Sequence, residues 1–399
     1  MTTPISADDD TRSTRRLILI LAICGFASAL STRFADPMVG VIARDLAADP
    51  LKVALLSTAF ALPYALIQPI LGPIGDALGK ERILKFLLLA LALTLGAASF
   101  ATDLQALLVL RVLSGAAAGG VIPLSLATIG DRVEMGERQV AIGRFLAAAI
   151  SGGLLGGAGA GVLAEHVGWR GVFAVAAALS GLSAAAVTVG FGRAQAARGA
   201  FSLTVALQRY RRILGISRAR ALMLFVFVEG VLMFGILPYV APLLEEARLG
   251  GAMEAGLIIG AFAVGGLLYT MLVRWLLRTL GLRRMLWTAG LICAAAFGAL
   301  APTLPWPAQA AAMGFAGLAF YMLHNSFQTQ MTEVVQDARG SAVALHALFF
   351  FVGQALGPVV FGFLLAGTGR AGAMAFSAVG FAILGYVASR VFGSPQRPR

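Results

Sequence analysis

The chain has 399 residues, of which 59% are hydrophobic and only 13% are charged. With a mean hydropathy of +0.87, these residues leave too little polar surface to cover a soluble globule of this size. The composition therefore excludes a soluble globular protein and predicts an integral membrane protein. The chain has three histidines and two cysteines, and no phosphate loop, nucleophile elbow, dinucleotide fingerprint or metal-ligand spacing. We expect no enzyme, no catalytic or metal-binding residue and no cofactor.

Twelve apolar segments follow one another along the chain. Each has a length suited to crossing a ~30 Å hydrocarbon core as a helix. They predict transmembrane helices at 17–42, 53–72, 84–101, 104–129, 142–164, 169–191, 220–243, 254–275, 285–301, 308–330, 342–366 and 372–392. The first segment has no cleavage pattern of a signal peptide, so we expect it to be retained. The predicted fold class is an all-α membrane protein with 12 transmembrane helices.

The basic residues predict the orientation, because Lys and Arg are retained on the cytoplasmic side of short loops. With the N-terminus inside, the tails and the loops on that side hold 24 of the 31 Lys and Arg. The opposite loops hold five: Arg44, Lys52, Arg170, Arg248 and Arg370. We expect a multi-pass protein of the cytoplasmic (inner) membrane of a bacterium, with both termini cytoplasmic. Topology then accounts for the net charge of +12, and no nucleic-acid partner is needed.

An internal repeat relates the two parts of the chain at an offset of 201 residues. It places Arg138, Gly152, Gly156, Gly161 and Pro37 onto Arg339, Gly353, Gly357, Gly362 and Pro238. The predicted organisation is a tail at 1–16, a six-helix half at 17–192, a linker at 193–219, a second half at 220–392 and a tail at 393–399. Two like-oriented halves of this kind are typical of secondary transporters, in which the substrate binds between the halves near the midplane.

Several motifs together resemble the major facilitator superfamily, and the resemblance covers nearly the whole chain. The loop after the second span reads GPIGDALGKER and is similar to the superfamily pattern G-x-x-x-D-R-x-G-R-R. The positions that fit are Gly72, Asp76, Gly79 and Lys80. Ala77 and Glu81 depart from the pattern, and Arg82 supplies a basic residue beside them. The resemblance implies that this loop has a gating role, in which Asp76 caps a facing helix N-terminus; the alternative is that Asp76 is a solvated acid of the loop.

The fourth and fifth spans extend this resemblance. Arg111 and Gly115 fit the pattern R-x-x-Q-G, and Asp131 and Arg138 fit the loop that follows. The fifth span contains GGLLGGAGAG and resembles the antiporter signature G-x8-G-x3-G-P-x2-G-G. The matching glycines are Gly143, Gly152, Gly156 and Gly161; the signature proline is absent here but present as Pro358 after Gly357 in the eleventh span. We expect Gly152, Gly156, Gly161 and their repeats, Gly353 among them, to form close-packing flanks where the halves meet and slide.

Ionisable residues within the spans are the main site candidates, since such a side chain costs about 2.5–3.5 kcal/mol on insertion scales. Arg33 and Asp36 lie three apart on one helix face. They form either a neutralised structural pair or a site at which Asp36 couples a proton to transport. Glu229 is a candidate site for a proton or a cationic substrate. The alternative is that it forms a hydrogen bond with the backbone of a neighbouring helix. For Arg111 three roles are open: to balance the negative charge of the acids, to contact an anionic substrate, or to form hydrogen bonds with backbone carbonyls. The resemblance implies that their helices line a central cavity.

The tenth span adds a polar stretch, YMLHNSFQTQ. His324, Asn325 and Gln328 are predicted either to line the cavity or to form interhelical hydrogen bonds.

The predicted function is secondary active transport of a small molecule by rocking of two pseudo-symmetric six-helix bundles. Because no ATP-binding motif is present, we expect a proton gradient to supply the energy. The resemblance favours proton-coupled efflux, by antiport, of a drug-like compound or metabolite. Two alternatives stay open: an importer or facilitator of a small organic anion, and a non-transporting membrane sensor or lipid-handling protein. The expected partners are the substrate, protons and membrane lipids, and we expect a monomer.

Overall fold

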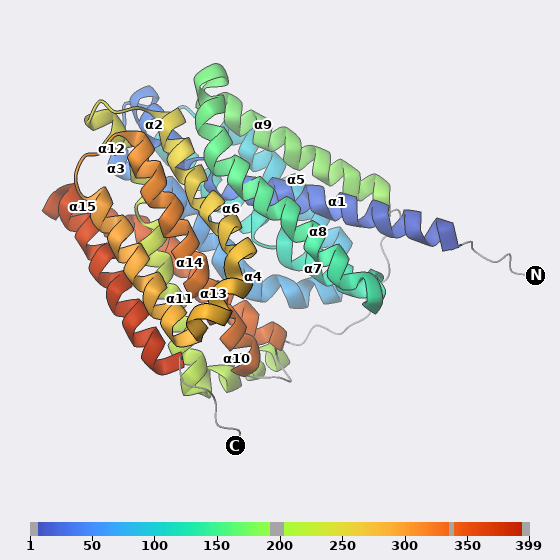
Figure 1. Cartoon of the computed structure of the whole chain (residues 1–399). Coiled ribbons are helices and arrows are strands. Elements are labelled where there is room, and N and C mark those ends of the chain that lie inside the picture. Colours follow the sequence, from blue (N-terminus) through green and yellow to red (C-terminus); the bar gives the residue numbers. More distant parts are fainter. Residues whose placement is uncertain (1–6, 192–202, 335–338, 393–399) are drawn as a thin grey trace, which may run out of the picture.

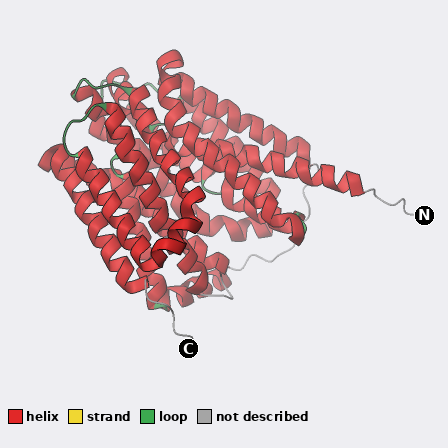
Figure 2. Ribbon diagram, viewed as in Figure 1, coloured by secondary structure: helices red, strands yellow, loops and turns green. Residues whose placement is uncertain are grey.

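The computed structural model describes residues 7–191, 203–334 and 339–392, with side chains except at 7–13, 72–73, 76–77, 135–136, 203–206 and 339–340. These residues form helices and loops and contain no strand (Figure 2). In chain order the helices are α1 (Ala7–Arg33), η1 (Asp36–Met38), α2 (Val39–Asp45), α3 (Pro50–Val53), α4 (Leu55–Leu78), α5 (Lys80–Ala98), α6 (Leu104–Ala118), α7 (Val121–Arg132), α8 (Met135–Leu154), η2 (Leu155–Gly159), α9 (Ala160–Phe191), α10 (Leu203–Gly215), α11 (Ser217–Phe234), η3 (Leu237–Tyr239), α12 (Val240–Glu246), α13 (Ala252–Leu300), α14 (Trp306–Val334) and α15 (Arg339–Phe392).

Helices lie at all twelve ranges that the sequence predicts as spans. Three of them, α9, α13 and α15, each run through two predicted ranges and break between the two at Gly168, Gly281 and Gly369. Each of these glycines has a φ between +64° and +69°, a conformation that other residues rarely adopt. Seven helical runs in the described part of the chain are long and apolar enough to cross a membrane.

Two helices extend into regions that the sequence assigns to a tail and a linker. Helix α1 begins at Ala7, before the predicted first span at residue 17. Helix α10 lies inside the predicted linker 193–219. The remainder of that linker up to residue 202, together with residues 1–6 and 393–399 of the predicted tails, lies outside the described residues.

The first and seventh spans are interrupted at matching prolines. Pro37 lies in η1 and Pro238 in η3, where a residue without an N–H group cannot continue an α-helix. Short helices, α2 and α12, follow these turns. The bounds of η1 and α2 become those of η3 and α12 when 201 is added to each residue number. The repeat found in the sequence is therefore also a repeat of backbone structure.

Two helical bundles pack against each other (Figure 1), one coloured blue to green and the other yellow-green to red. The first contains α1 to α9 and the second α11 to α15. Contacts between them join α4 to α15, α9 and η2 to α13, and α2 and η1 to α12 and η3. We call the end of the molecule formed by α2, α3 and α12 the α2–α12 end. An ion pair between Arg44 and Glu245 connects the two bundles there.

Close glycine contacts within each bundle repeat at the same offset. A Cβ atom on Gly152 would lie 2.3 Å from the carbonyl oxygen of Phe26, and one on Gly353 would lie 2.1 Å from that of Phe227. We expect Gly152→Ala and Gly353→Ala each to destabilise the protein by about 1–3 kcal/mol, because the extra methyl group overpacks the contact. Thermal unfolding of the purified protein measures the effect. Gly153→Ala is the control, since that Cβ would meet nothing within 4 Å; equal effects at all three positions would contradict the prediction.

Candidate functional site

Arg33 and Asp36 lie together where α1 ends and η1 begins. Their side chains form an ion pair with Nη1 of Arg33 3.4 Å from Oδ2 of Asp36. The side chain of Asp36 is fully buried, and Ser57 of α4 donates a hydrogen bond to its other oxygen. The break at Pro37 places this carboxylate inside the bundle. The sequence-predicted pair is thus one local unit with both carboxylate oxygens occupied.

Arg33 also reaches the second bundle. Its Nη2 donates a hydrogen bond to the side-chain oxygen of Gln354 in α15. Its guanidinium lies 4.3 Å from the ring centroid of Phe234 at the end of α11, in a cation–π contact. One cation therefore connects a buried carboxylate of the first bundle to two side chains of the second.

The contact between α4 and α15 continues beside this connection. Thr58 donates a 2.6 Å hydrogen bond to the carbonyl oxygen of Ala355. Tyr64 and Phe351 form an edge-to-face aromatic pair with centroids 4.8 Å apart. Motion of one bundle against the other must change these contacts together with those of Arg33.

Arg111 is fully buried in α6 and bonds mainly to backbone. It donates to the carbonyl oxygens of Ser31 at 3.1 Å and Leu56 at 3.4 Å. Its guanidinium also lies 4.2 Å from the ring centroid of Phe60 and 5.2 Å from that of Phe34. The side chain therefore connects α6 to α1 and α4, the two helices next to Asp36, and acts as a structural cross-link.

The second bundle has its own buried carboxylate, Glu229 of α11. Its Oε2 lies 3.0 Å from Nδ1 of His324 in α14, and its side chain is fully buried. The other oxygen, Oε1, has no hydrogen-bond partner among the described residues. This carboxylate is thus only partly satisfied, in contrast to Asp36.

A second histidine and several aromatic rings surround this pair. His346 of α15 is 1% exposed, and its ring centroid lies 5.5 Å from that of His324. Neither of its ring nitrogens has a hydrogen-bond partner among the residues described. The rings of Phe320 and Phe350 lie 5.3 Å and 4.4 Å from His324. The polar groups therefore sit in an apolar environment.

The other two candidates of the tenth span lie apart from Glu229. Asn325 donates a 2.9 Å hydrogen bond to the hydroxyl of Tyr269 in α13, which is an interhelical bond. Gln328 is exposed. Of the three predicted residues, only His324 therefore contacts a buried acid.

The motif between α4 and α5 forms ion pairs with the end of α7. Lys80 lies 2.5 Å from Asp131, and Glu81 pairs with Arg132. Burial raises the pKa of Glu81, while the charge of Arg132 acts to lower it. Gly79 joins the two helices at a φ of +93°. Arg82 is exposed, and Arg138 donates to the carbonyl oxygen of Val133. Gly72 and Asp76 fall in α4, and the side chain of Asp76 lies outside the described part.

The glycines of the fifth span contact two different partners. Gly152 and Gly156 lie against Phe26 and Leu30 of α1, within the same bundle. Gly161 lies against Ala252 of α13, in the other bundle. Gly156 lies in a π-helix turn, Leu155–Gly159, a distortion found often at functional sites. The expectation that all these glycines lie where the halves meet is therefore wrong for the first two.

The glycines of the eleventh span stay within the second bundle. Gly353 and Gly357 lie against α11, and the carbonyl oxygen of Pro358 accepts a 2.6 Å hydrogen bond from Tyr239. These three positions therefore hold α15 to the kinked seventh span.

Three residues at this site were not predicted from the sequence. Ser57, Gln354 and Phe234 contact the Arg33–Asp36 pair from other helices. Neutral polar and aromatic residues are common in apolar spans, so nothing in their local sequence marks them. Phe234 lies 201 residues after Arg33, and that offset was the only signal available.

The fold and the site define a helical membrane protein built from two repeated bundles, with buried ionisable groups between and within them. The profile of the Major Facilitator Superfamily matches residues 21–358. The chain belongs to this superfamily of membrane transporters.

Individual relatives are more distant. The MFS efflux transporter aclA of Aspergillus oryzae is 26% identical over 181 residues, which cover 45% of this chain and 33% of that protein. The uridine/deoxyuridine transporter of Lactococcus lactis subsp. cremoris is 28% identical over 191 residues, 47% of this chain and 39% of that protein. The matches thus span well under half the length of these relatives.

A solved structure has the same fold. A crystal structure of a variant of the nucleoside transporter NupG superposes with a TM-score of 0.76 at 18% identity, covering 94% of this chain and all of that one. At this identity the likeness concerns the fold alone.

Proposed function

We propose that the protein is a secondary active transporter that moves a small molecule across the cytoplasmic membrane of a bacterium by alternating access. In this proposal protons enter as a drug-like compound or metabolite leaves. The protein acts as a monomer without a cofactor, and both termini face the cytoplasm. The observation that supports it best is the connection from Asp36 through Arg33 to Gln354.

This connection offers a physical link between bundle motion and charge. When the bundles separate at this point, Arg33 loses Gln354 and the ring of Phe234, and its position relative to Asp36 changes. The free energy of protonating Asp36 then differs between the two conformations, since a nearby charge and access to water both set it. Such a difference is what proton coupling requires.

Glu229 supplies a second candidate for the proton or for a cationic substrate. Its unpartnered Oε1 is able to accept a hydrogen bond from either. Arg111 gives less support to the importer of an organic anion, because Nε and Nη1 of its guanidinium bond backbone carbonyls and two aromatic rings lie against it, which leaves only Nη2 without a hydrogen-bond partner among the described residues. Relatives named for efflux and for nucleoside transport are both found.

The test uses purified protein in liposomes with an imposed pH gradient. Candidate substrates are first selected by ligand-induced thermal stabilisation, which reports binding to the folded state. We expect flux of a selected compound to follow the gradient and to respond to its reversal. Tight binding without flux would instead favour a sensor or lipid-handling protein and would overturn the proposal.

Glu229→Gln is expected to lower the ratio of flux with the gradient to flux without it by at least about tenfold. A tenfold change in rate corresponds to about 1.4 kcal/mol. The substitution removes the titrating group but keeps an oxygen near His324. The measurement is the ratio of flux with and without the gradient. Glu165→Gln, at an exposed carboxylate of α9, is the control. An unchanged ratio in Glu229→Gln would show that this carboxylate takes no part in coupling.

A further inference from the structure

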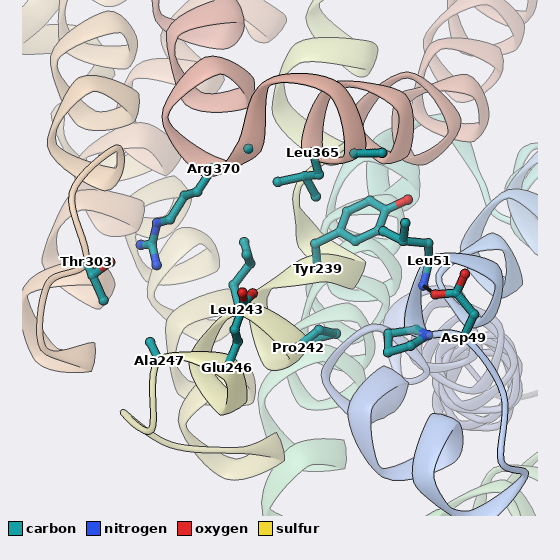
Figure 3. Close-up of a pocket in the computed structure, with 13 residues that line it drawn as sticks. Asp49, Leu51, Tyr239, Pro242, Leu243, Glu246, Ala247, Thr303, Leu365 and Arg370 are labelled. Carbon is teal, nitrogen blue, oxygen red and sulfur yellow. Dashed lines mark hydrogen bonds between the residues drawn. The ribbon is translucent and has the colours of Figure 1, made fainter.

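A cavity of about 670 Å³ lies at the α2–α12 end (Figure 3), and its lining residues include neither Asp36 nor Glu229. Its walls come from both bundles: Asp49–Leu51 from the first, and parts of α12, the α13–α14 connection and α15 from the second. Asp49 and Glu246 are exposed side chains, so the cavity opens to the surface. This volume suits a small organic molecule.

The internal repeat shows what fills the equivalent space in the first bundle. At the offset of 201, Glu246 corresponds to Asp45 and Arg370 to Trp169. The indole of Trp169 donates a 3.0 Å hydrogen bond to Asp45. Arg170 forms an ion pair with the same carboxylate and lies 4.2 Å from the ring centroid of Trp169. An aromatic ring with a cation over its face therefore occupies the position beside Asp45.

The second bundle has neither of these groups in place. Ala371 stands where the repeat would have the arginine. Arg370, in the place of the tryptophan, turns its guanidinium to the carbonyl oxygen of Leu300 at 2.9 Å and to the side chain of Gln309 at 3.1 Å. Within the described ranges, Glu246 has no ion pair or hydrogen bond. By the repeat, the cavity thus lies beside the positions at which the first bundle carries an aromatic ring and a cation.

We propose that this cavity binds an organic cation with an aromatic body. The positive group pairs with Glu246 as Arg170 pairs with Asp45, and the ring packs on the apolar wall that includes Leu243. Two acidic lining residues against the single Arg370 leave the cavity with a net negative charge that favours a monocation. The site is independent of the central acids and of the transport function proposed above.

The position of the cavity gives the ligand a second effect. Since both bundles form its walls, the ligand binds best to the conformation in which Asp49–Leu51 lies next to α12. The Arg44–Glu245 ion pair connects the bundles in that same conformation. A ligand shifts an equilibrium by its differential affinity for the two states, so occupancy keeps the α2–α12 end closed.

The experiment places a cysteine in the cavity. Both native cysteines, Cys24 and Cys293, are buried, and Thr303 is an exposed lining residue. In Thr303→Cys, tetraphenylphosphonium is expected to slow labelling by a maleimide about tenfold at saturation, the size of effect that a 1.4 kcal/mol difference produces. Thr102→Cys is the matched control, because Thr102 is exposed and is the repeat equivalent of Thr303 in the first bundle, where Trp169 stands in the place of Arg370. Its labelling should not change.

Further variants in the Thr303→Cys background locate the ligand. Asp49→Asn combined with Glu246→Gln should raise the half-protecting concentration by about tenfold or more, while Glu165→Gln should leave it unchanged. Arg370→Trp combined with Ala371→Arg rebuilds the arrangement of the first bundle and should abolish protection.

Absence of protection in the Thr303→Cys protein would overturn the proposal, as would protection that survives all cavity variants. Protection lost only in Glu229→Gln would assign the cation to the centre of the molecule instead. Because labelling requires no flux, these results are independent of whether the protein transports protons.

Discussion

Asp36→Asn is expected to lower gradient-driven flux at least about tenfold and to weaken the fold at the same time. The first effect follows from loss of the titrating carboxylate. The second follows because Arg33, 12% exposed, would lose its only ion pair among the described residues. Removing one partner of a buried ion pair costs about 3–5 kcal/mol. Flux in liposomes and thermal unfolding of the purified protein measure the two effects separately.

The double variant Arg33→Gln, Asp36→Asn separates coupling from folding. Replacing both charges removes the unpaired cation, so we expect the double variant to unfold at a higher temperature than Asp36→Asn alone. Its flux should still ignore the gradient. If the double variant regained gradient-driven flux, Asp36 would be a structural residue only, which was the alternative left open by the sequence.

Arg111→Leu is expected to destabilise the first bundle by about 3 kcal/mol. The substitution removes two cation–π contacts, each worth up to about 2 kcal/mol when desolvated, and the bonds to the Ser31 and Leu56 carbonyl oxygens. Chemical or thermal unfolding in detergent measures the loss. Arg144→Leu, at an exposed position of α8, should change stability by less than about 0.5 kcal/mol. Similar stabilities of the two variants would contradict the structural role of Arg111.

The helical architecture could be predicted because a bilayer imposes it. Apolar segments long enough to cross the membrane must satisfy their backbone internally, and helices lie at every predicted range. Breaks inside these helices were partly visible as well, since Pro37 and Pro238 mark η1 and η3. The start of α1 at Ala7 was missed because its first turns, ADDDTRSTRR, are polar and lie outside the apolar segment.

The candidate site was only partly predictable for a related reason. A charge in an apolar span is conspicuous, so Arg33, Asp36, Arg111 and Glu229 could be selected from sequence. Their partners could not, because a contact such as Arg33 with Gln354 joins residues 321 positions apart. The side of a helix that a glycine faces is equally a tertiary property. Gly152 and Gly161 look alike in sequence yet contact different bundles.

The offset of 201 also has a consequence for how the two bundles face each other. Arg44 contacts Glu245, and Arg33 contacts Phe234, so in both cases a residue meets its own repeat equivalent. In a symmetric dimer of identical chains, such a contact would set two copies of the same residue against each other, and two arginines would repel. Fusion of the halves into one chain removes this restriction. Two equivalent positions that contact each other can then carry different residues, such as the opposite charges of Arg44 and Glu245. Each half can also keep its own buried acid.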